Sequence, residues 1–185
     1  MTDLTKIFSN FVSQATLQNF NDEMIFFSKM SMIDWCGVAY AAKKEPVSKI
    51  VTKLIDEEQT RGLSRLISNG KEVSAKSAAF VNGTIGHALD YDDTHFLFTG
   101  HPTASAFPTA LALGEELGSS IDEIMLAYMC GVEVSTRLGH ILGYSHYNKA
   151  FHQTATSRAF GATVLATKML KIKGTIPTKN RATPV

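Results

Sequence analysis

Cysteine is scarce in this 185-residue chain, which carries only Cys36 and Cys130. The two lie far apart in the sequence and each falls within a predicted helix, so neither a disulfide framework nor a CxxC metal site is indicated. Two cysteines are also too few to hold an iron–sulfur cluster within this chain. We therefore expect no cofactor that depends on cysteine ligands.

A surplus of positive charge is lacking too, because 18 basic residues face 17 acidic ones and the formal net charge is +1. Proteins that bind nucleic acid neutralise its phosphates with a concentrated positive field, so we expect no nucleic-acid partner. The first residues, MTDLTKIFSNF, have neither a basic region nor an uninterrupted apolar run, and the apolar stretch from Met30 to Ala42 is broken by Asp34. We therefore expect a cytoplasmic protein with no membrane partner.

Alternation between apolar and polar residues, the pattern of a half-buried strand, is also missing, and no fixed-period repeat occurs. Apolar residues make up 44% of the chain and charged residues 19%, which is typical of a globular protein of about one domain. What remains is helical periodicity. The sequence thus predicts an all-α fold, a multi-helix bundle-like domain over residues 1–173.

Several start signals divide this domain into helices. Asp3 and Asn21 are predicted N-caps, and Ser120 with Glu123 forms a capping box. Apolar residues recur at helical spacing in seven stretches, which are residues 4–15, 22–43, 47–55, 74–88, 102–117, 121–139 and 154–171. The second helix is apolar on so many faces that we expect it to be largely buried.

Glycine and proline mark the interruptions. Residues 61–71 contain strong turn signals and are predicted to be irregular, and Gly139 can end the sixth helix. The helix from Ser74 is rich in alanine and glycine, which lets another element approach its backbone closely. Residues 174–185 contain Pro177 and Pro184 without periodicity, so we expect a disordered tail.

Ionisable residues are concentrated in two polar segments between helices, residues 90–101 and 144–153. All six histidines lie in or near this part of the chain, and they are His87, His95, His101, His140, His146 and His152. Histidine exchanges protons near neutral pH, and loops held by rigid helices commonly carry sites. His87 and His140 fall on helices and are interpreted as ordinary helix residues, while His95 and His146 stay undecided.

A metal site is one interpretation of these residues, because aspartate and histidine both ligate divalent ions. The standard patterns are absent. An EF-hand beginning at Asp90 needs glycine at its sixth position and glutamate at its twelfth, where the chain has His95 and His101, and no HExxH motif occurs. We therefore expect no metal, with a nonstandard site as the alternative.

Long sequence motifs identify a protein family more specifically than any single residue does. In chain order these segments are MSMIDWCGVAYAA around Asp34, NGTIGHALDYDDTH from Asn82, HPTASAFPTALALGEELG from His101, AYMCGVEVSTRLG ending at Gly139, and FHQTATSRAFGATVLATKML from Phe151. Together they resemble the MmgE/PrpD family, the group that contains 2-methylcitrate dehydratase. Gln153 stands where the family motif has proline.

The resemblance implies a lyase that acts on a small di- or tricarboxylate without metal or organic cofactor. It places Asp90, Thr94, His101 and His152 in the pocket. His101 and His152 would transfer protons or bind a carboxylate, Asp90 would orient or accept a proton, and Thr94 would form a hydrogen bond. Which histidine is acid and which is base stays open, as does the choice among dehydration, decarboxylation of the cis-aconitate type and epimerisation of the iminodisuccinate type.

The resemblance also implies a homodimer and a second, mixed α/β domain that completes the pocket. Family chains are much longer than this one, so we expect an incomplete site with little activity alone. A noncatalytic helical remnant or dimerisation module is the alternative function.

Overall fold

The computed structural model describes residues 3–172. Seven α-helices account for most of them, joined by a short 3₁₀ segment and one small hairpin. In chain order the elements are α1 (Leu4–Gln14), η1 (Leu17–Asn19), α2 (Asp22–Ala42), α3 (Pro46–Glu58), β1 (Ser64–Arg65), β2 (Glu72–Val73), α4 (Ala75–Gly86), α5 (Thr103–Leu117), α6 (Ile121–Asn148) and α7 (Gln153–Met169). The predicted all-α class is confirmed.

The three side-chain caps predicted from the sequence are all present. Asp3 Oδ1 accepts a hydrogen bond from the Lys6 amide at 3.2 Å, and Asn21 Oδ1 accepts one from the Met24 amide at 2.8 Å. Ser120 and Glu123 form the reciprocal box, since each side chain accepts from the backbone amide of the other. These bonds satisfy amides that have no partner inside the helix.

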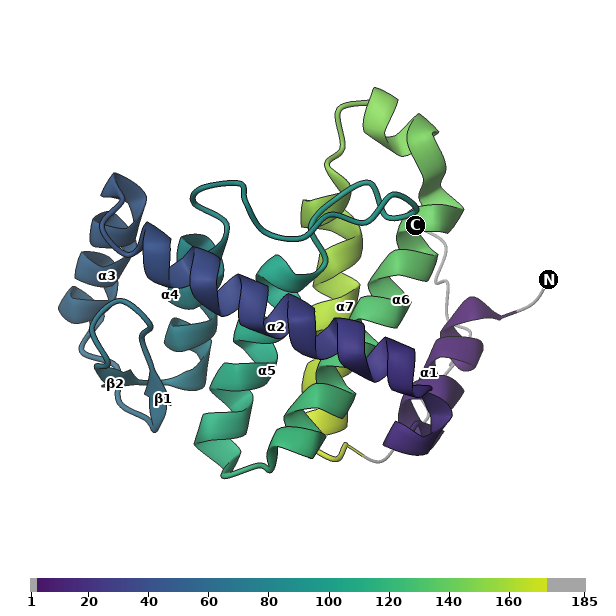
Figure 1. The fold of residues 1–185 in the computed structure, drawn as a ribbon, viewed down its shortest axis with the longest axis horizontal. Coiled ribbons are helices and arrows are strands. Elements are labelled where there is room, and N and C mark those ends of the chain that lie inside the picture. Colours follow the sequence, from purple (N-terminus) through teal and green to yellow (C-terminus); the bar gives the residue numbers. More distant parts are fainter. Residues whose placement is uncertain (1–2, 173–185) are drawn as a thin grey trace, which may run out of the picture.

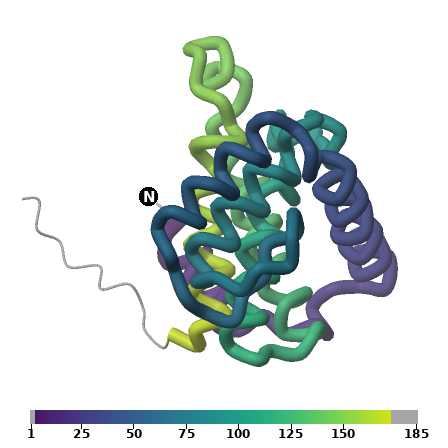
Figure 2. The backbone as a smooth tube through the Cα atoms, turned by 90° about the vertical axis from the view of Figure 1, so that its left-hand side faces the viewer, coloured from purple at the N-terminus to yellow at the C-terminus, as the bar shows by residue number. Residues whose placement is uncertain are grey.

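Helices α5, α6 and α7 stand side by side, and α4 lies beside α5 (Figure 1). Helix α2 crosses this layer obliquely and contacts α4, α5 and α6, whereas α3 packs against α4. Turned by 90°, the molecule shows α2 along its outer side, with the other helices on one side of it only (Figure 2). Helix α2 thus covers the bundle and is not enclosed by it.

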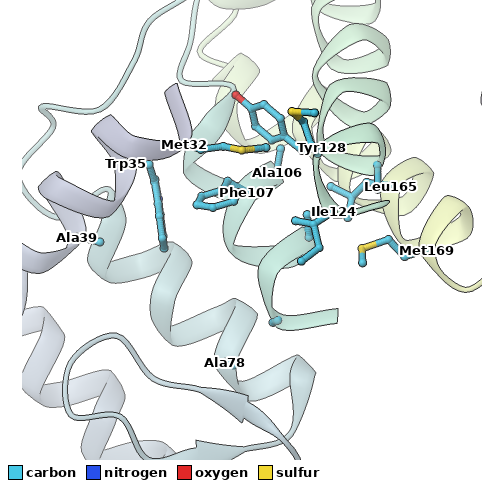
Figure 3. Close-up of a cluster of buried hydrophobic side chains, with 14 of the residues drawn as sticks. Met32, Trp35, Ala39, Ala78, Ala106, Phe107, Ile124, Tyr128, Leu165 and Met169 are labelled. Atoms are coloured by element: carbon cyan, nitrogen blue, oxygen red, sulfur yellow. The ribbon is translucent and has the colours of Figure 1, made fainter. Parts of the chain in front are cut away.

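The core forms where α2 meets this layer (Figure 3). Trp35 of α2 is fully buried, and its ring meets Phe107 of α5 edge to face at 5.3 Å between centroids. A Cβ atom on Gly86 of α4 would lie 2.1 Å from Trp35 Nε1, so only glycine admits the indole here. The predicted role of small residues in α4 is therefore confirmed at Gly86.

The prediction that α2 is largely buried is wrong. Only Met32, Trp35, Ala39 and Ala42 are buried on it. Its outward side carries exposed large hydrophobic residues, namely Met24, Phe26, Phe27, Met30, Ile33 and Tyr40. The apolar residues on every face of α2 were correctly recognised, but nothing among residues 3–172 covers the outer ones.

Two boundaries also differ from the predictions. Helix α6 continues past Gly139, because that glycine serves close packing: a Cβ there would lie 2.7 Å from the Phe98 ring. The helix instead bends at Gly143, where φ is 60°, and ends at Asn148. Residues 61–71, predicted to be irregular, contribute β1, which pairs with β2 in a two-residue antiparallel hairpin.

Among residues 3–172, no helix combines the length and the hydrophobicity that crossing a bilayer requires. The predicted disordered tail, residues 174–185, lies outside the described residues. The division at residue 173 therefore remains a prediction.

Candidate active site

The candidate site is built on the connection between α4 and α5, residues 87–102. This connection is anchored at Phe98, which is fully buried and packs against Gly139 of α6. A backbone bridge joins His95 to Gly100, and a Cβ on Gly100 would lie 2.5 Å from Thr154 Oγ1 of α7. Contacts to α6 and α7 therefore hold the loop in place, and the intervening side chains are presented by a fixed backbone.

A second anchor joins the loop to the start of α5. Asp93 accepts hydrogen bonds from the amide of Thr103 at 3.1 Å and from its hydroxyl at 2.6 Å, and that hydroxyl lies 2.7 Å from Tyr128 Oη of α6. Burial raises the pKa of Asp93, while the hydrogen bonds from Thr103 oppose the rise. Burial likewise raises the pKa of Tyr128, so its phenol stays protonated. This chain of bonds fixes His101, two residues before Thr103.

Four ionisable side chains from this connection lie close together. His101 Nε2 lies 3.3 Å from Asp90 Oδ1, and His101 Nδ1 lies 3.6 Å from Asp92 Oδ2. The ring of His87, at the end of α4, is 4.6 Å from the ring of His101 between centroids. Two imidazoles and two carboxylates thus occupy one small region.

The two carboxylates differ in their surroundings. The side chain of Asp90 is 76% exposed, and its backbone adopts a left-handed conformation with φ 55°, which turns the loop away from α4. The side chain of Asp92 is fully buried. Its Oδ1 accepts a hydrogen bond from His87 Nδ1 at 2.8 Å, whereas its Oδ2 has no hydrogen-bond partner among residues 3–172. Asp90 can reach a ligand, and Asp92 can act only on its neighbours.

This arrangement places oxygen atoms beside both histidines. The hydrogen bond that His87 donates to Asp92 raises the pKa of His87, and burial of the ring opposes the rise. Both ring nitrogens of His101 face oxygen atoms, because Nδ1 also lies 3.3 Å from the Asp92 carbonyl. A protonated His101 can donate on both sides, whereas a neutral ring can donate on only one. The His101 ring is therefore flanked by hydrogen-bond acceptors on both sides.

Of the four residues predicted for the pocket, the structure brings Asp90 and His101 together. Thr94 is exposed on the same loop, and His152 is exposed at the residue before α7, with its ring 6.0 Å from the Tyr147 ring. Within residues 3–172, neither side chain forms a hydrogen bond or ion pair with Asp90 or His101. Both side chains are open to solvent.

Comparison with known proteins agrees with the motif order. A family model described as the MmgE/PrpD N-terminal domain matches residues 6–175, which is most of the chain. The chain belongs to the MmgE/PrpD family. Its curated relatives include the human protein named cis-aconitate decarboxylase, 26% identical over 182 residues, and the mouse protein of the same name, 28% identical over 177 residues.

A protein of Aspergillus oryzae named cis-aconitate decarboxylase-like protein oryM is 21% identical over 184 residues. The aligned parts cover 95% of this chain for the human and Aspergillus proteins and 92% for the mouse protein. The same aligned parts cover only 37% of the human protein, 37% of the Aspergillus protein and 36% of the mouse protein. This MmgE/PrpD chain therefore spans little more than a third of the length of the relatives it matches.

Two of the four clustered side chains, His87 and Asp92, were not predicted from the sequence. His87 was interpreted as an ordinary helix residue, but it ends α4 and binds Asp92. Asp92 was only one of three acidic residues in the motif. A usable signal was present, since His87 lies near the end of a predicted helix and Asp92 follows five residues later. The turn at Asp90 that joins them is a tertiary feature.

The two undecided histidines, His95 and His146, and the helix residue His140 lie apart from the four clustered side chains. The His146 Nε2 atom lies 2.9 Å from Thr156 Oγ1, and its ring stacks on Phe151 at 4.9 Å, which ties the end of α6 to α7. His95 contributes its backbone to the bridge with Gly100, and its Nδ1 is buried without a partner among residues 3–172. His140 is exposed on α6. None of the three reaches the cluster.

Gln153, which stands where the family motif has proline, has a structural role. Gln153 is buried at the start of α7, and its Nε2 donates to the carbonyls of Gly139 and Gly143 at 3.2 and 3.4 Å. Its Oε1 accepts from Ser157 Oγ at 2.7 Å. The bend at Gly143 leaves carbonyls without their helical partners, and a proline here could not supply these donors. Gln153 therefore fastens α7 to the bent part of α6.

The cluster is also the place where this MmgE/PrpD domain could hold a metal. One ligand atom from each of His87, Asp90, Asp92 and His101 lies within 4.8 Å of the others. Imidazole nitrogens and carboxylate oxygens are ligands that zinc accepts. The lack of an EF-hand or HExxH motif therefore does not decide whether these four residues bind a metal. The absence of a metal remains a prediction.

Proposed function

We propose that this chain supplies one wall of a lyase active site that acts on a small di- or tricarboxylate, with His101 as the proton-transfer group. The observation that carries the proposal is the position of His101, between exposed Asp90 on its Nε2 side and buried Asp92 on its Nδ1 side. General acid–base catalysis needs a titrating group that is held in place and open to substrate on one side. Membership of the MmgE/PrpD family supports the same function.

Each predicted residue has a role in this proposal. His101 gives or takes the proton beside a substrate carboxylate, and Asp90 accepts a proton from His101 or orients it. Thr94 and His152, which are both exposed, would contact the substrate, His152 as a second proton carrier or a carboxylate ligand. Donors that stabilise developing negative charge would complete the machinery.

Decarboxylation of a cis-aconitate-like acid is the reaction that the relatives favour, since three of them carry cis-aconitate decarboxylase in their names. Loss of carbon dioxide leaves an electron pair that a neighbouring unsaturated carboxylate can accept, and one carbon must then be protonated. Dehydration of a 2-methylcitrate-like acid and epimerisation need the same proton transfer, so they are the next reactions to test.

The length of the chain limits what it can do alone. A small-molecule site needs preorganised groups on several sides, and this chain corresponds to 37% of the human relative. We therefore propose that the remaining wall comes from a further polypeptide segment. Turnover by this chain alone should be low or absent.

The test compares the chain alone with the chain fused to the remainder of the human relative. Carbon dioxide release from cis-aconitate and ultraviolet absorbance of the dehydration product of 2-methylcitrate would be followed. We expect turnover by the fusion that falls at least about 100-fold with His101→Asn, the usual scale for a proton-transfer group. His140→Asn on the exposed side of α6 is the control. A folded fusion without turnover, or turnover unchanged by His101→Asn, would overturn the proposal.

A second candidate function is favoured by the outward side of α2. Phe26, Phe27 and Ile33 are each more than half exposed there, and a row of large apolar side chains on one helix is typical of an interface. A noncatalytic module would pair two copies of the chain through α2. Ile33→Glu should then convert a dimer to a monomer in sedimentation velocity. Ile50→Glu on α3 is a matched control, because Ile50 is 67% exposed and Ile33 66%.

A further inference from the structure

A cavity of about 510 Å³ lies next to the candidate site, between α4, α5 and α7. His87 belongs to both, since its ring packs on His101 and also lines the cavity. The rest of the wall includes Phe80 and Thr84 of α4, Ser105 of α5 and Arg158 of α7. The volume is within the range of small-molecule sites.

Arg158 is the unusual member of this wall. Its Nη1 donates to the carbonyl oxygen of His101 at 3.3 Å, and no carboxylate among residues 3–172 lies within 4.0 Å of it. The residue is half-buried, and burial lowers the pKa of its guanidinium, although an arginine stays charged at neutral pH. A charge withdrawn from water without a counter-ion is costly, so this position favours an anionic ligand.

The first turn of α5 adds neutral donors to the same wall. Ala104 and Ser105 line the cavity as the second and third residues of this 15-residue helix. Amides in a first turn have no partner inside the helix and carry partial positive charge. The hydroxyl of Ser105 has no hydrogen-bond partner among residues 3–172 either. The donors thus come from two helices that meet at the cavity.

Nearby carboxylates limit how much negative charge the cavity accepts. Asp92 and Asp93 act on Arg158 through their charges, but each is engaged elsewhere, Asp92 with His87 and Asp93 with Thr103. One guanidinium and one helix terminus can balance a single negative charge against this background. A planar carboxylate also matches the two parallel N–H groups of a guanidinium. A phosphate dianion suits this cavity less well.

We propose that this cavity is a carboxylate subsite, in which Arg158, the Ser105 hydroxyl and the first turn of α5 bind one carboxylate of a small polycarboxylate. The inference rests on the proposed function for its substrate class. The proposal adds a binding position for a carboxylate of the substrate that lies away from the reacting atoms. Because Arg158 binds the backbone of His101, an occupied cavity would also hold His101 in position.

The first test uses the unmodified chain. Phenylglyoxal modifies exposed guanidinium groups, and mass spectrometry of peptides reports each arginine separately. We expect tricarballylate, a saturated tricarboxylate with no hydroxyl to eliminate and no double bond, to slow modification of Arg158 at least 5-fold. Arg61, Arg65 and Arg137 serve as internal controls. No selective protection of Arg158 would overturn the proposal.

The second test measures the affinity of tricarballylate by calorimetry. Arg158→Gln should weaken binding at least 10-fold and Arg158→Lys less, because lysine keeps the charge without the paired donors. Arg61→Gln is the matched control, since Arg61 is exposed and lines no described cavity. Equal affinities for Arg158→Gln and the unmodified chain, or inorganic phosphate binding as tightly as tricarballylate, would contradict a carboxylate subsite.

The two proposals fail in different ways. Tricarballylate is not turned over, so its binding reports the subsite without the reaction. His101→Asn should lower turnover by the fusion at least about 100-fold and leave tricarballylate affinity within about 3-fold. If binding depends on Arg158 while turnover does not depend on His101, the subsite stands and the catalytic proposal falls. The reverse result removes the subsite alone.

Discussion

Asp92 Oδ1 accepts a hydrogen bond from His87 Nδ1 at 2.8 Å, and this pair of a buried carboxylate and a partly exposed imidazole belongs to the candidate site. The second oxygen of Asp92 faces His101 Nδ1 at 3.6 Å without a hydrogen bond. One carboxylate thus links two histidines that come from different segments of the chain. The pair explains how an exposed loop can hold His101 in one orientation.

Removal of the Asp92 carboxylate should change the titration of His87. Asp92→Asn loses the charge that favours a protonated ring, so we expect the pKa of His87 to fall. The shift can be followed through the His87 ring proton by nuclear magnetic resonance. Asp56→Asn, at an exposed residue that pairs with Lys71, should leave the His87 pKa unchanged. An unchanged pKa in Asp92→Asn would show that the pair is not formed in solution.

The same pair should make stability depend on pH. The pKa of His87 is raised in the folded state, so its contribution is complete below the unfolded value of about 6.5 and disappears as the pH rises through the folded value. The loss of unfolding free energy in His87→Gln should therefore be larger at about pH 5.5 than at pH 8. Urea denaturation at both values measures it. In an Asp92→Asn background this pH dependence should vanish.

The close contact between Gly86 of α4 and Trp35 of α2 predicts that a methyl group at residue 86 lowers stability. Gly86→Ala places a Cβ 2.1 Å from Trp35 Nε1, so α2 must shift, and overpacking of this kind costs about 1–3 kcal/mol. Gly37→Ala is the matched control, because nothing lies within 4 Å of its Cβ position and alanine favours a helix by about 1 kcal/mol over glycine. Urea denaturation should show opposite signs for the two variants.

Elemental analysis would decide between proton transfer and a metal centre at the cluster. The proposed function needs no metal, so dialysis against a chelator should leave tricarballylate binding and turnover by the fusion unchanged. A stoichiometric metal that is lost in Asp92→Asn would instead assign His87, Asp90, Asp92 and His101 as ligands. In that case His101 could not act as the proton carrier.

Some expectations from the sequence have no structural counterpart. The cytoplasmic location, the absence of a nucleic-acid partner and the homodimer remain predictions. The exposed side of α2 supports the dimer as a proposal. The residues of the predicted tail lie outside residues 3–172.

The sequence by itself determined the all-α class, the helix starts at Asp3, Asn21 and Ser120, and the family. It also placed Asp90 and His101 in one loop. These features depend on local periodicity, on caps that join residues three apart, and on the order of long motifs. Each can be recognised without knowing how the helices pack.

Only the tertiary structure decided which side chains meet. His87 and Asp92 pair through the turn at Asp90, and Arg158 reaches the His101 carbonyl from 57 residues further along the chain. The same holds for α2, whose apolar residues indicated burial although only one side is covered, and for Gly139, which packs on Phe98 within a helix it was predicted to end. Periodicity reports where a helix forms and which residues are apolar. Which neighbour covers each face depends on contacts between distant segments, and these are set by the packing of the whole domain.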